Sequence, residues 1–412
     1  MFSASPSPSA SRSPQKTAYV RSVSEVGRVD YEMEFYPVAL NHDVSGVEDD
    51  GSVKFITPIK AAIVPLYGGF AAVDNKLYCM GGNPPFDYKS YRKVRSLHCF
   101  DTSSRIPTKS SWKRCASMHN GRFLPPTVVV GSKIFVFSGL QGPNWKARQW
   151  AEVYDTKSGK WTFLSPPPQL PTAFGLFAVA LTGPSRGKFL VGSCADDFFY
   201  TYYVEDGHWD RWDNKMDSAI PCNVIPVAVN TTLFWFNYGK LHAYDLITKC
   251  SYLGCIKDLD KVIPLDSLVP PNNIFCPAVH HVADNVFSLL CVEYFSVQHQ
   301  SALLHCVQFS ISDGVVQVGK DVCLDATVRC SKAYAIPMPD QILDAVVIQR
   351  LRKIELVFKL AEASKNFWFY GPGKQLHFGL VGVGLKVGED VSACYLLSMG
   401  SFVAELHNVL GF

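Results

Sequence analysis

The sequence predicts an all-β fold, a β-propeller built from four-stranded blades, with six blades expected and five or seven as the alternatives. Three observations lead to this prediction. Aromatic residues make up 13% of the 412 residues and occur with 29 Gly and 26 Pro, which favours short strands and tight turns. Short apolar runs separated by turn residues recur from about residue 60. Matching positions in successive runs lie about one blade apart along the chain.

The clearest repeated unit is Phe70–Gly82, where a strand, an Asp74-Asn75 turn and a buried strand end in a glycine pair. A third strand follows at Leu97–Thr102, and then Trp112. The later copies are Thr127–Gly139 with Ala151–Thr156 and Trp161, Leu176–Gly192 with Tyr202–Asp206 and Trp209, and Val227–Phe236 with Leu241–Asp245 and Tyr252. The Asp after the third strand falls at positions 101, 155, 206 and 245, at intervals of 54, 51 and 39 residues. A blade needs about 40 to 50 residues, so these intervals fit a propeller.

Three residue types are expected to have structural roles in each unit. A glycine that ends a buried strand allows positive φ and a close backbone approach. An Asp after the third strand can accept hydrogen bonds from the backbone N–H groups of its own turn. A Trp beyond that turn is expected to cover the gap between neighbouring blades. The positions assigned to these roles are Gly81, Gly82 and Gly139, then Asp101, Asp155 and Asp245, and finally Trp112 and Trp161.

These residues resemble the kelch repeat, over about Ile59–Gly254. One nearly complete repeat is made by Met118, Arg122, Thr127–Val130, Ile134–Gly139, Tyr154-Asp155 and Trp161. Within the family, the chain looks similar to plant kelch proteins, many of which carry an F-box. The resemblance implies a kelch-type propeller, as in galactose oxidase, and a non-catalytic protein-interaction module. It also implies a relation to F-box/kelch proteins, which commonly present substrates to a Skp–cullin ubiquitin ligase.

The chain is predicted to contain three regions. Residues 1–28 form a Ser- and Pro-rich tail, and we expect disorder because Met1–Ser24 has no acidic residue and little apolar surface to bury. Residues 29–338 form the propeller, and the alternating segment Val29–Val38 is expected to supply a closing strand, so that both chain ends complete the ring. Residues 339–412 form a C-terminal segment that either completes the last blade or is a degenerate F-box-like helical region.

The segment Met338–Leu351 has apolar residues at helical spacing, such as Ile342 and Val346. It resembles the opening of an F-box, and Ala363–Trp368 resembles the ending of one. An F-box normally precedes kelch repeats, whereas this segment follows them. A Skp adaptor is therefore expected as a partner only if residues 339–368 are a real F-box. The alternative is that Ala345–Leu360 contains propeller strands or a helix packed on the rim.

Loops on a rigid scaffold are the expected place for a binding site, and the predicted partner is a protein. Two loops, Pro84–Arg95 and Leu140–Trp150, concentrate the residue types that dominate protein interfaces. Arg122 precedes its strand and is expected to point towards the mouth of the central channel. The candidate binding residues are Arg122, Trp145, Arg148, Trp150, Tyr91 and Arg92. The alternative is that the aromatic residues pin their loops to the rim.

An enzyme that uses the channel mouth is the alternative function, either an oxidase or a small-molecule lyase. Because the resembling family includes copper oxidases, a copper site has to be considered. The only adjacent His pair is His280-His281, and no Tyr or His residues near it have a spacing that suggests copper ligands. Neighbouring strand residues also point to opposite faces. The sequence contains no phosphate-binding loop, zinc-protease or serine-hydrolase motif. We therefore predict no catalytic residue, no metal and no cofactor.

The composition indicates which classes of partner are not expected and in which compartment the protein is located. The chain has 39 Lys+Arg and 36 Asp+Glu, a net charge of +3, without a polybasic segment, so no nucleic-acid partner is expected. No apolar run reaches the length of about 20 residues that a membrane helix needs, so no membrane partner is expected either. Thirteen scattered Cys and the lack of a signal-peptide pattern predict a reducing, cytoplasmic or nuclear location. An organelle transit peptide is the less favoured alternative.

Overall fold

The computed structural model describes residues 15–26, 30–40, 53–61, 64–83, 94–103, 112–139, 149–213, 220–221, 224–264, 277–294, 301–318, 321–337 and 341–350. These residues form β-strands and two short 3-10 helices, η4 (Gly183–Ser185) and η5 (Leu259–Lys261), without any α-helix. The described part of the chain thus offers no helix with the length and hydrophobicity to span a bilayer. The all-β prediction is confirmed.

The strands form six antiparallel blades, each named here from its innermost to its outermost strand. Blade 1 contains β26 (Gln341–Arg350), β1 (Gln15–Val26), β2 (Asp30–Ala39) and β4 (Ile59–Ala61). Blade 2 contains β5 (Gly69–Val73), β6 (Lys76–Met80), β7 (Leu97–Asp101) and β8 (Lys113–Arg114). Blade 3 contains β9 (Thr127–Val130), β10 (Lys133–Phe137), β11 (Ala151–Asp155) and β12 (Lys160–Phe163).

The remaining three blades follow the same plan. Blade 4 contains β13 (Leu176–Ala180), β14 (Lys188–Ser193), β15 (Phe198–Tyr203) and β16 (His208–Asp213). Blade 5 contains β17 (Val227–Val229), β18 (Thr232–Asn237), β19 (Lys240–Asp245) and β20 (Ser251–Gly254). Blade 6 contains β22 (Ala278–Ala283), β23 (Val286–Tyr294), β24 (Ser301–Val318) and β25 (Asp321–Pro337).

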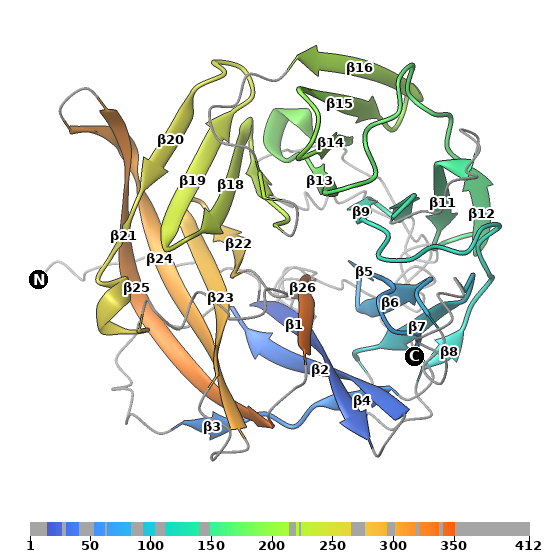
Figure 1. Ribbon diagram of the computed structural model, residues 1–412, viewed down its shortest axis with the longest axis horizontal. Coiled ribbons are helices and arrows are strands. Elements are labelled where there is room, and N and C mark those ends of the chain that lie inside the picture. Colours follow the sequence, from blue (N-terminus) through green and yellow to red (C-terminus); the bar gives the residue numbers. More distant parts are fainter. Residues whose placement is uncertain are drawn as a thin grey trace, which may run out of the picture. The chain divides into compact units, whose positions relative to one another are not determined.

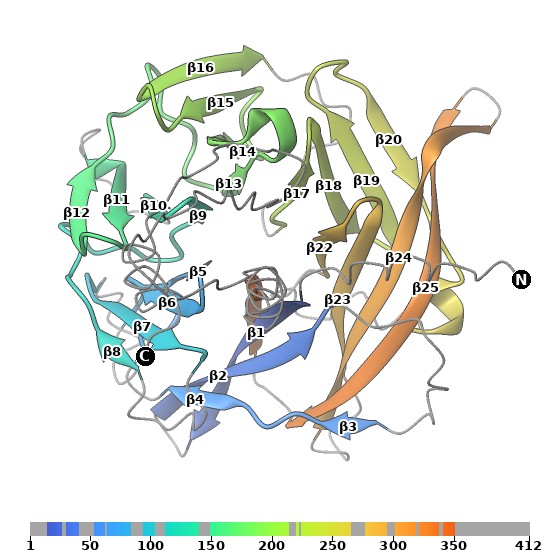
Figure 2. The same ribbon diagram turned by 180° about the vertical axis from the view of Figure 1, so that it is seen from behind.

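The innermost strands close the ring. Contacts run from β26 to β5, β9, β13, β17 and β22 in turn, and then back to β26. Figures 1 and 2 show the blades around this centre, with β4, β8, β12 and β16 on the outside. The kelch-type propeller with six blades is therefore confirmed.

Blades 5 and 6 depart from the regular plan because they join into one ten-stranded sheet. The outer edge of the long strand β25 pairs in parallel with β20, with β21 (Ile256–Lys257) and with β3 (Lys54–Phe55). An exposed strand of 17 residues would present a row of unpaired backbone groups to other chains. The three short strands cover part of that edge.

Blade 1 is built from both ends of the described chain, as the closing-strand prediction for Val29–Val38 required. The predicted disorder is wrong for part of the N-terminal tail, and of the two alternatives for the C-terminal segment the helical one is wrong over residues 341–350. Residues 15–26 are not disordered, because β1 pairs along its length with β2 and with β26. Residues 341–350 are not helical, because β26 is the innermost strand of this blade. The C-terminal segment thus completes the last blade over those residues, and its part from residue 351 onward, including Ala363–Trp368, lies outside the described residues.

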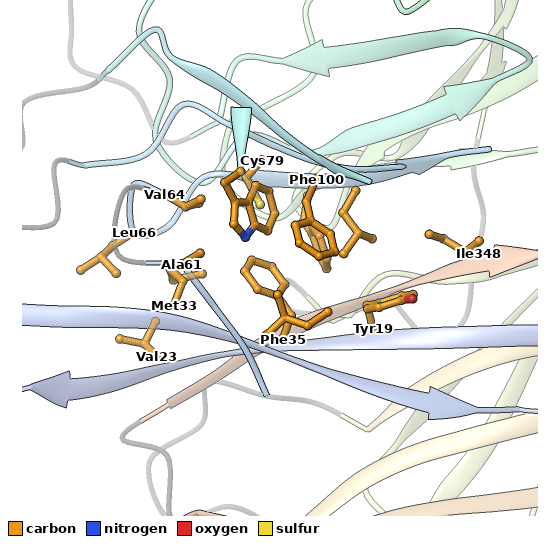
Figure 3. Packing of buried hydrophobic residues seen from close by; sticks show 14 residues of the cluster. Tyr19, Val23, Met33, Phe35, Ala61, Val64, Leu66, Cys79, Phe100 and Ile348 are labelled. Carbon is orange, nitrogen blue, oxygen red and sulfur yellow. The ribbon is translucent and has the colours of Figure 1, made fainter. Parts of the chain in front are cut away.

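Apolar clusters fill the spaces between blades. Alternate residues of β2 point to different clusters, so that Met33 and Phe35 face blade 2 whereas Tyr36 and Val38 face blade 6. Figure 3 shows the first of these clusters, where the Phe35 ring packs 4.9 Å from the ring of Trp112. Full burial of one such side chain stabilises the fold by about 2–3 kcal/mol, so these contacts hold neighbouring blades together.

Candidate protein-docking face

The strand order gives the propeller two distinct faces. Strands alternate in direction within each blade, so the connections from second to third strand and from fourth strand to the next blade emerge on one side. We call this side the loop face. The tight turns between first and second strands and between third and fourth strands lie on the opposite side, the turn face. The candidate sites are placed with respect to these two faces.

The predicted Asp positions organise the turn face. Asp155 Oδ1 accepts the Lys157 N–H at 2.9 Å, and Asp245 Oδ1 accepts the Thr248 N–H at 2.7 Å. Asp101 Oδ1 does the same with the Ser103 N–H at 2.9 Å. The Thr after Asp101 and after Asp155 binds the carbonyl of the neighbouring turn, through the contacts Thr102 Oγ1 to Asn75 O and Thr156 Oγ1 to Ser132 O. Each of these three Asp residues therefore accepts a hydrogen bond from the backbone of its own turn.

The glycine positions have the predicted backbone conformation. Gly81, Gly82 and Gly139 have φ values of 73°, 91° and 68°, which disfavour any side chain. A Cβ on Gly82 would overlap the backbone oxygen of Leu66, and one on Gly139 would overlap the backbone oxygen of Phe123. These glycines let the chain that leaves the second strand of blades 2 and 3 pass close to the connection that enters from the preceding blade.

The predicted Trp positions lie between blades. Trp112 packs in the cluster between blades 1 and 2, and Trp161 packs between blades 2 and 3. The Trp161 indole N–H also donates to Ala116 O at 2.7 Å. Trp209 repeats this contact with Ser165 O at 2.9 Å in the next blade. Each of the two latter Trp residues therefore fixes the start of a connection on the loop face.

Arg122 lies under the loop face, where it is fully buried and forms an ion pair with Glu152. Its Nη2 donates to Glu152 Oε1 at 2.8 Å, and its Nη1 donates to Trp150 O at 3.1 Å. Glu152 also accepts the backbone N–H groups of His119 at 2.7 Å and Asn120 at 3.0 Å. The network ties the connection between blades 2 and 3 to the third strand of blade 3.

The charge of Glu152 is stabilised by its partners. Burial opposes ionisation of Glu152, but the adjacent Arg122 guanidinium and the hydrogen bonds from His119 outweigh burial and lower the pKa of the carboxyl. A buried charge stays ionised in a protein interior only when it is paired and hydrogen-bonded. The network therefore fixes the backbone of residues 119–122 beneath the loop face.

Large apolar side chains are exposed on the loop face. Six of the ten most exposed ones in the described residues lie there, with exposed fractions from 38% to 81%. They are Leu124, Phe163, Leu170, Phe174, Ile225 and Tyr238. Leu124, Leu170, Phe174 and Ile225 lie on connections that enter blades 3, 4 and 5. Only Ile247 lies on the turn face among these ten, and the others lie near the outer edge strands β3 and β20.

The backbone of this face is unusual as well. Tyr67, Leu124 and Tyr238 have φ values of 55°, 48° and 47°, a left-handed conformation that bulky residues rarely adopt. The connection Leu164–Gly175 contains four prolines and no charged residue. Proline restricts φ, so this connection presents its apolar side chains from a stiff backbone.

Comparison with known proteins identifies the repeat. A model of the Kelch motif matches residues 121–168, which include Arg122, Glu152 and Trp161. A putative F-box/kelch-repeat protein of Arabidopsis thaliana is 28% identical over 202 residues, covering 48% of this chain and 51% of that protein. A second Arabidopsis F-box/kelch-repeat protein is 26% identical over 211 residues, covering 48% and 52%.

The chain thus carries a kelch motif over residues 121–168 and is similar over about half of its length to F-box/kelch-repeat proteins. It spans about half the length of the curated relatives that it matches. The motif and the relatives support a protein-interaction module of the kelch type.

Two of the predicted binding residues have another role in the structure. Arg122 was expected at the channel mouth, but it is buried because Glu152, 30 positions later, neutralises its charge. Trp150 is also buried, since its ring packs 5.2 Å from Phe137 and 5.5 Å from Trp209. Both therefore support the loop face from below, which corrects the prediction that they form its surface. Tyr91, Arg92, Trp145 and Arg148 lie outside the described residues.

The exposed apolar residues of the loop face were missed by sequence reasoning. The available signal was weak: apolar residues such as Phe174 and Ile225 lie in Pro-containing connections, outside the strand pattern. Sequence alone does not distinguish such a residue from Phe177, which is buried in the next strand.

The oxidase alternative gains no support from the His pair. His280 and His281 both lie on β22, and the His281 Nε2–H donates to Asp284 O at 2.8 Å. Burial lowers the pKa of His280 to about 4. In the described part of the chain, no group of three or more His, Cys, Asp or Glu is placed to bind a metal ion. The absence of a metal and of a cofactor stays a prediction.

Proposed function

We propose that this kelch-repeat protein is a non-catalytic recognition module that binds a partner protein through the apolar side chains of its loop face. The observation that supports the proposal most is the concentration of exposed large apolar residues there, against Ile247 alone among the described residues of the turn face. Exposed apolar patches on soluble proteins often mark interaction sites.

The scaffold fits this role. The Arg122–Glu152 network and the interblade Trp residues hold the connections in place before any partner arrives. A surface that is ordered in advance loses little conformational entropy on binding, so more of the apolar contact energy appears as affinity. The left-handed backbone at Leu124 and Tyr238 is consistent with a functional surface, since strained residues concentrate at such sites.

The expected partner presents apolar side chains in an extended segment or on the face of a helix. Connection Leu164–Gly175 offers no charge to attract a polybasic or acidic partner. Substrate recognition for a ubiquitin ligase is a finer form of the same proposal. Recruitment of a Skp adaptor through residues 339–368 is not part of it, because residues 341–350 belong to β26. A cytoplasmic or nuclear location stays part of the proposal.

The test compares two double variants, each of which replaces two exposed apolar side chains by serine. The loop-face variant combines Phe174→Ser with Tyr238→Ser, and the control combines Ile247→Ser with Phe55→Ser, since all four side chains are more than half exposed. Immobilised protein captures partners from an extract of the native source, and mass spectrometry quantifies them. The loop-face variant should lose at least one partner about tenfold, as expected when a hot spot worth about 1.4 kcal/mol is removed. Equal capture by both variants would overturn the proposal.

A further inference from the structure

Cys99 and Cys115 are neighbours on the outer part of blade 2. Cys99 lies on β7, and Cys115 directly follows β8. Cys99 is opposite Lys113 in the sheet, and the Cys115 N–H donates to Leu97 O at 2.8 Å. The two cysteines are therefore diagonal neighbours on one face of the sheet. Both are partly exposed, and each thiol influences the ionisation of the other.

We propose that Cys99 and Cys115 form a redox-sensitive site, in which Cys99 is the nucleophile, Cys115 is the resolving thiol, and a peroxide is the oxidant. The site belongs to the gap between blades 2 and 3. Both cysteines pack against the cluster that contains Tyr78 and Tyr154. They reach solvent from this gap, unlike Cys79 on the neighbouring strand β6, which is buried.

The surroundings activate one thiol of the pair. The hydrogen bond with Cys115, together with the positive charges of Lys76 and Lys113, lowers the pKa of Cys99 to about 7, against the opposing effects of burial and Asp101. The thiolate, not the thiol, attacks a peroxide, so Cys99 has a reactive fraction near neutral pH. The same hydrogen bond raises the pKa of Cys115, which keeps its proton while Cys99 reacts.

Other described cysteines lack this combination. Burial raises the pKa of Cys79 to about 12 and that of Cys306 to about 11. These thiols stay protonated and enclosed. Cys99 is the one cysteine among the described residues that combines a lowered pKa with a second thiol diagonally opposite it in the sheet.

The proposed reaction has two balanced steps. The Cys99 thiolate attacks one oxygen of hydrogen peroxide, the O–O bond breaks, and Cys99 sulfenic acid forms with release of hydroxide. The Cys115 sulfur then attacks the Cys99 sulfur, the S–O bond breaks, and the hydroxyl group leaves with the Cys115 proton as water. Two thiols are oxidised to one disulfide, and one peroxide is reduced to two waters.

Disulfide formation requires a small movement of the outer strand. Diagonal neighbours in a sheet are separated by more than the Cβ–Cβ distance of about 4 Å in a disulfide, so Cys115 must approach by about 2–3 Å. Strand β8 has two residues, both exposed, and lies at the edge of the blade. The carbonyl of Ala116, next to Cys115, accepts a hydrogen bond from the Trp161 indole N–H. Oxidation should therefore also disturb this contact with blade 3.

The full chain is treated with hydrogen peroxide at neutral pH, its remaining thiols are blocked, and non-reducing digestion with mass spectrometry identifies linked peptides. We expect a Cys99–Cys115 link that reducing agent removes. Cys115→Ser keeps a hydrogen-bond donor but cannot form the link, so Cys99 should accumulate as sulfenic acid that a dimedone probe labels. Cys99→Ser should leave Cys115 unmodified, and Cys250→Ser, a change at an exposed cysteine, should behave like the native protein.

A second measurement separates activation from simple exposure. The pH at which alkylation of Cys99 is half-maximal should lie near 7 and should stay there in Cys115→Ser. It should rise by about one unit or more in Cys115→Ala, which removes the hydrogen-bond donor. Two results would overturn the proposal: peroxide consumption without a Cys99–Cys115 link in the native chain, or identical alkylation profiles for the native protein and Cys115→Ala.

Discussion

The ring is closed by an ion pair between residues from opposite ends of the described chain, and breaking it should destabilise the whole fold. Arg21 on β1 donates from Nε and Nη2 to the two carboxylate oxygens of Asp344 on β26, both at 2.7 Å. Its Nη1 donates to Gly68 O at 2.8 Å, next to strand β5 of blade 2. The guanidinium also lies over the Phe70 ring, 5.0 Å from its centroid. One side chain therefore joins both strands of the closure to the next blade.

We predict that Arg21→Met lowers the free energy of unfolding by about 2–3 kcal/mol. Removing one partner of a fully buried ion pair costs about 3–5 kcal/mol. The Arg21 side chain is 2% exposed but that of Asp344 is 25% exposed, so water can compensate part of the loss. The methionine retains apolar contact with Phe70. The remaining cost arises because the Asp344 carboxylate loses its ion-pair partner and the Gly68 carbonyl loses its hydrogen-bond donor.

The assay is urea unfolding followed by circular dichroism and by Trp fluorescence. The double variant Arg21→Met/Asp344→Leu should recover to within about 1 kcal/mol of the native protein, because apolar pairs often replace buried ion pairs without loss. As a control, Lys261→Met removes an exposed ion pair with Asp258 and should leave the urea midpoint unchanged. An Arg21→Met protein as stable as the native one, or a double variant less stable than either single variant, would refute the reasoning.

Two further predictions concern blades 2 and 3. Gly82→Ala should cost about 3 kcal/mol or more, because positive φ and overlap with the Leu66 carbonyl both oppose it, whereas Gly131→Ala meets no atom within 4 Å and should cost about 1 kcal/mol. Urea titration of both variants checks this, and equal losses would contradict it. In Glu152→Gln, the free energy of unfolding should fall less steeply as the pH is lowered. A carboxyl with a lowered pKa stabilises the fold above about pH 4.5, and this contribution is lost as the pH falls further. The difference in urea midpoint between native and Glu152→Gln protein should therefore shrink from pH 5 to pH 3, and a constant difference would argue against the role of Glu152.

The repeat was predictable from sequence because its signals are local. The turn Asp, the glycine pair and the interblade Trp each depend on a few neighbouring residues: Asp155 accepts a hydrogen bond in its own turn, Gly82 has positive φ, and the Trp161 indole N–H donates to Ala116 O. The limits of a repeat were predicted wrongly where the local signal was ambiguous. The third sequence copy, Leu176–Gly192, stops at Gly192, but this glycine lies within β14, where its lack of a side chain leaves room for the Phe199 ring.

Long-range pairing explains what sequence reasoning missed. Arg21 looked like one basic residue of a disordered tail, and its partner Asp344 lies 323 positions away. The segment with Ile342 and Val346 has helical spacing, yet pairing with β1 makes it a strand. Arg122 looked like a surface charge because its partner Glu152 belongs to another strand. The apolar loop-face residues were missed because exposure depends on the assembled ring.

Site-specific photo-crosslinking tests the central claim, recognition through the loop face, most directly. A photoreactive phenylalanine analogue replaces Phe174 or Tyr238 on the loop face, and Ile247 or Phe55 elsewhere, all exposed positions. After irradiation in an extract of the native source, mass spectrometry identifies the crosslinked proteins. The account predicts that one partner is crosslinked from both Phe174 and Tyr238 and from neither control position. A partner crosslinked only from Ile247 or Phe55 would contradict the account.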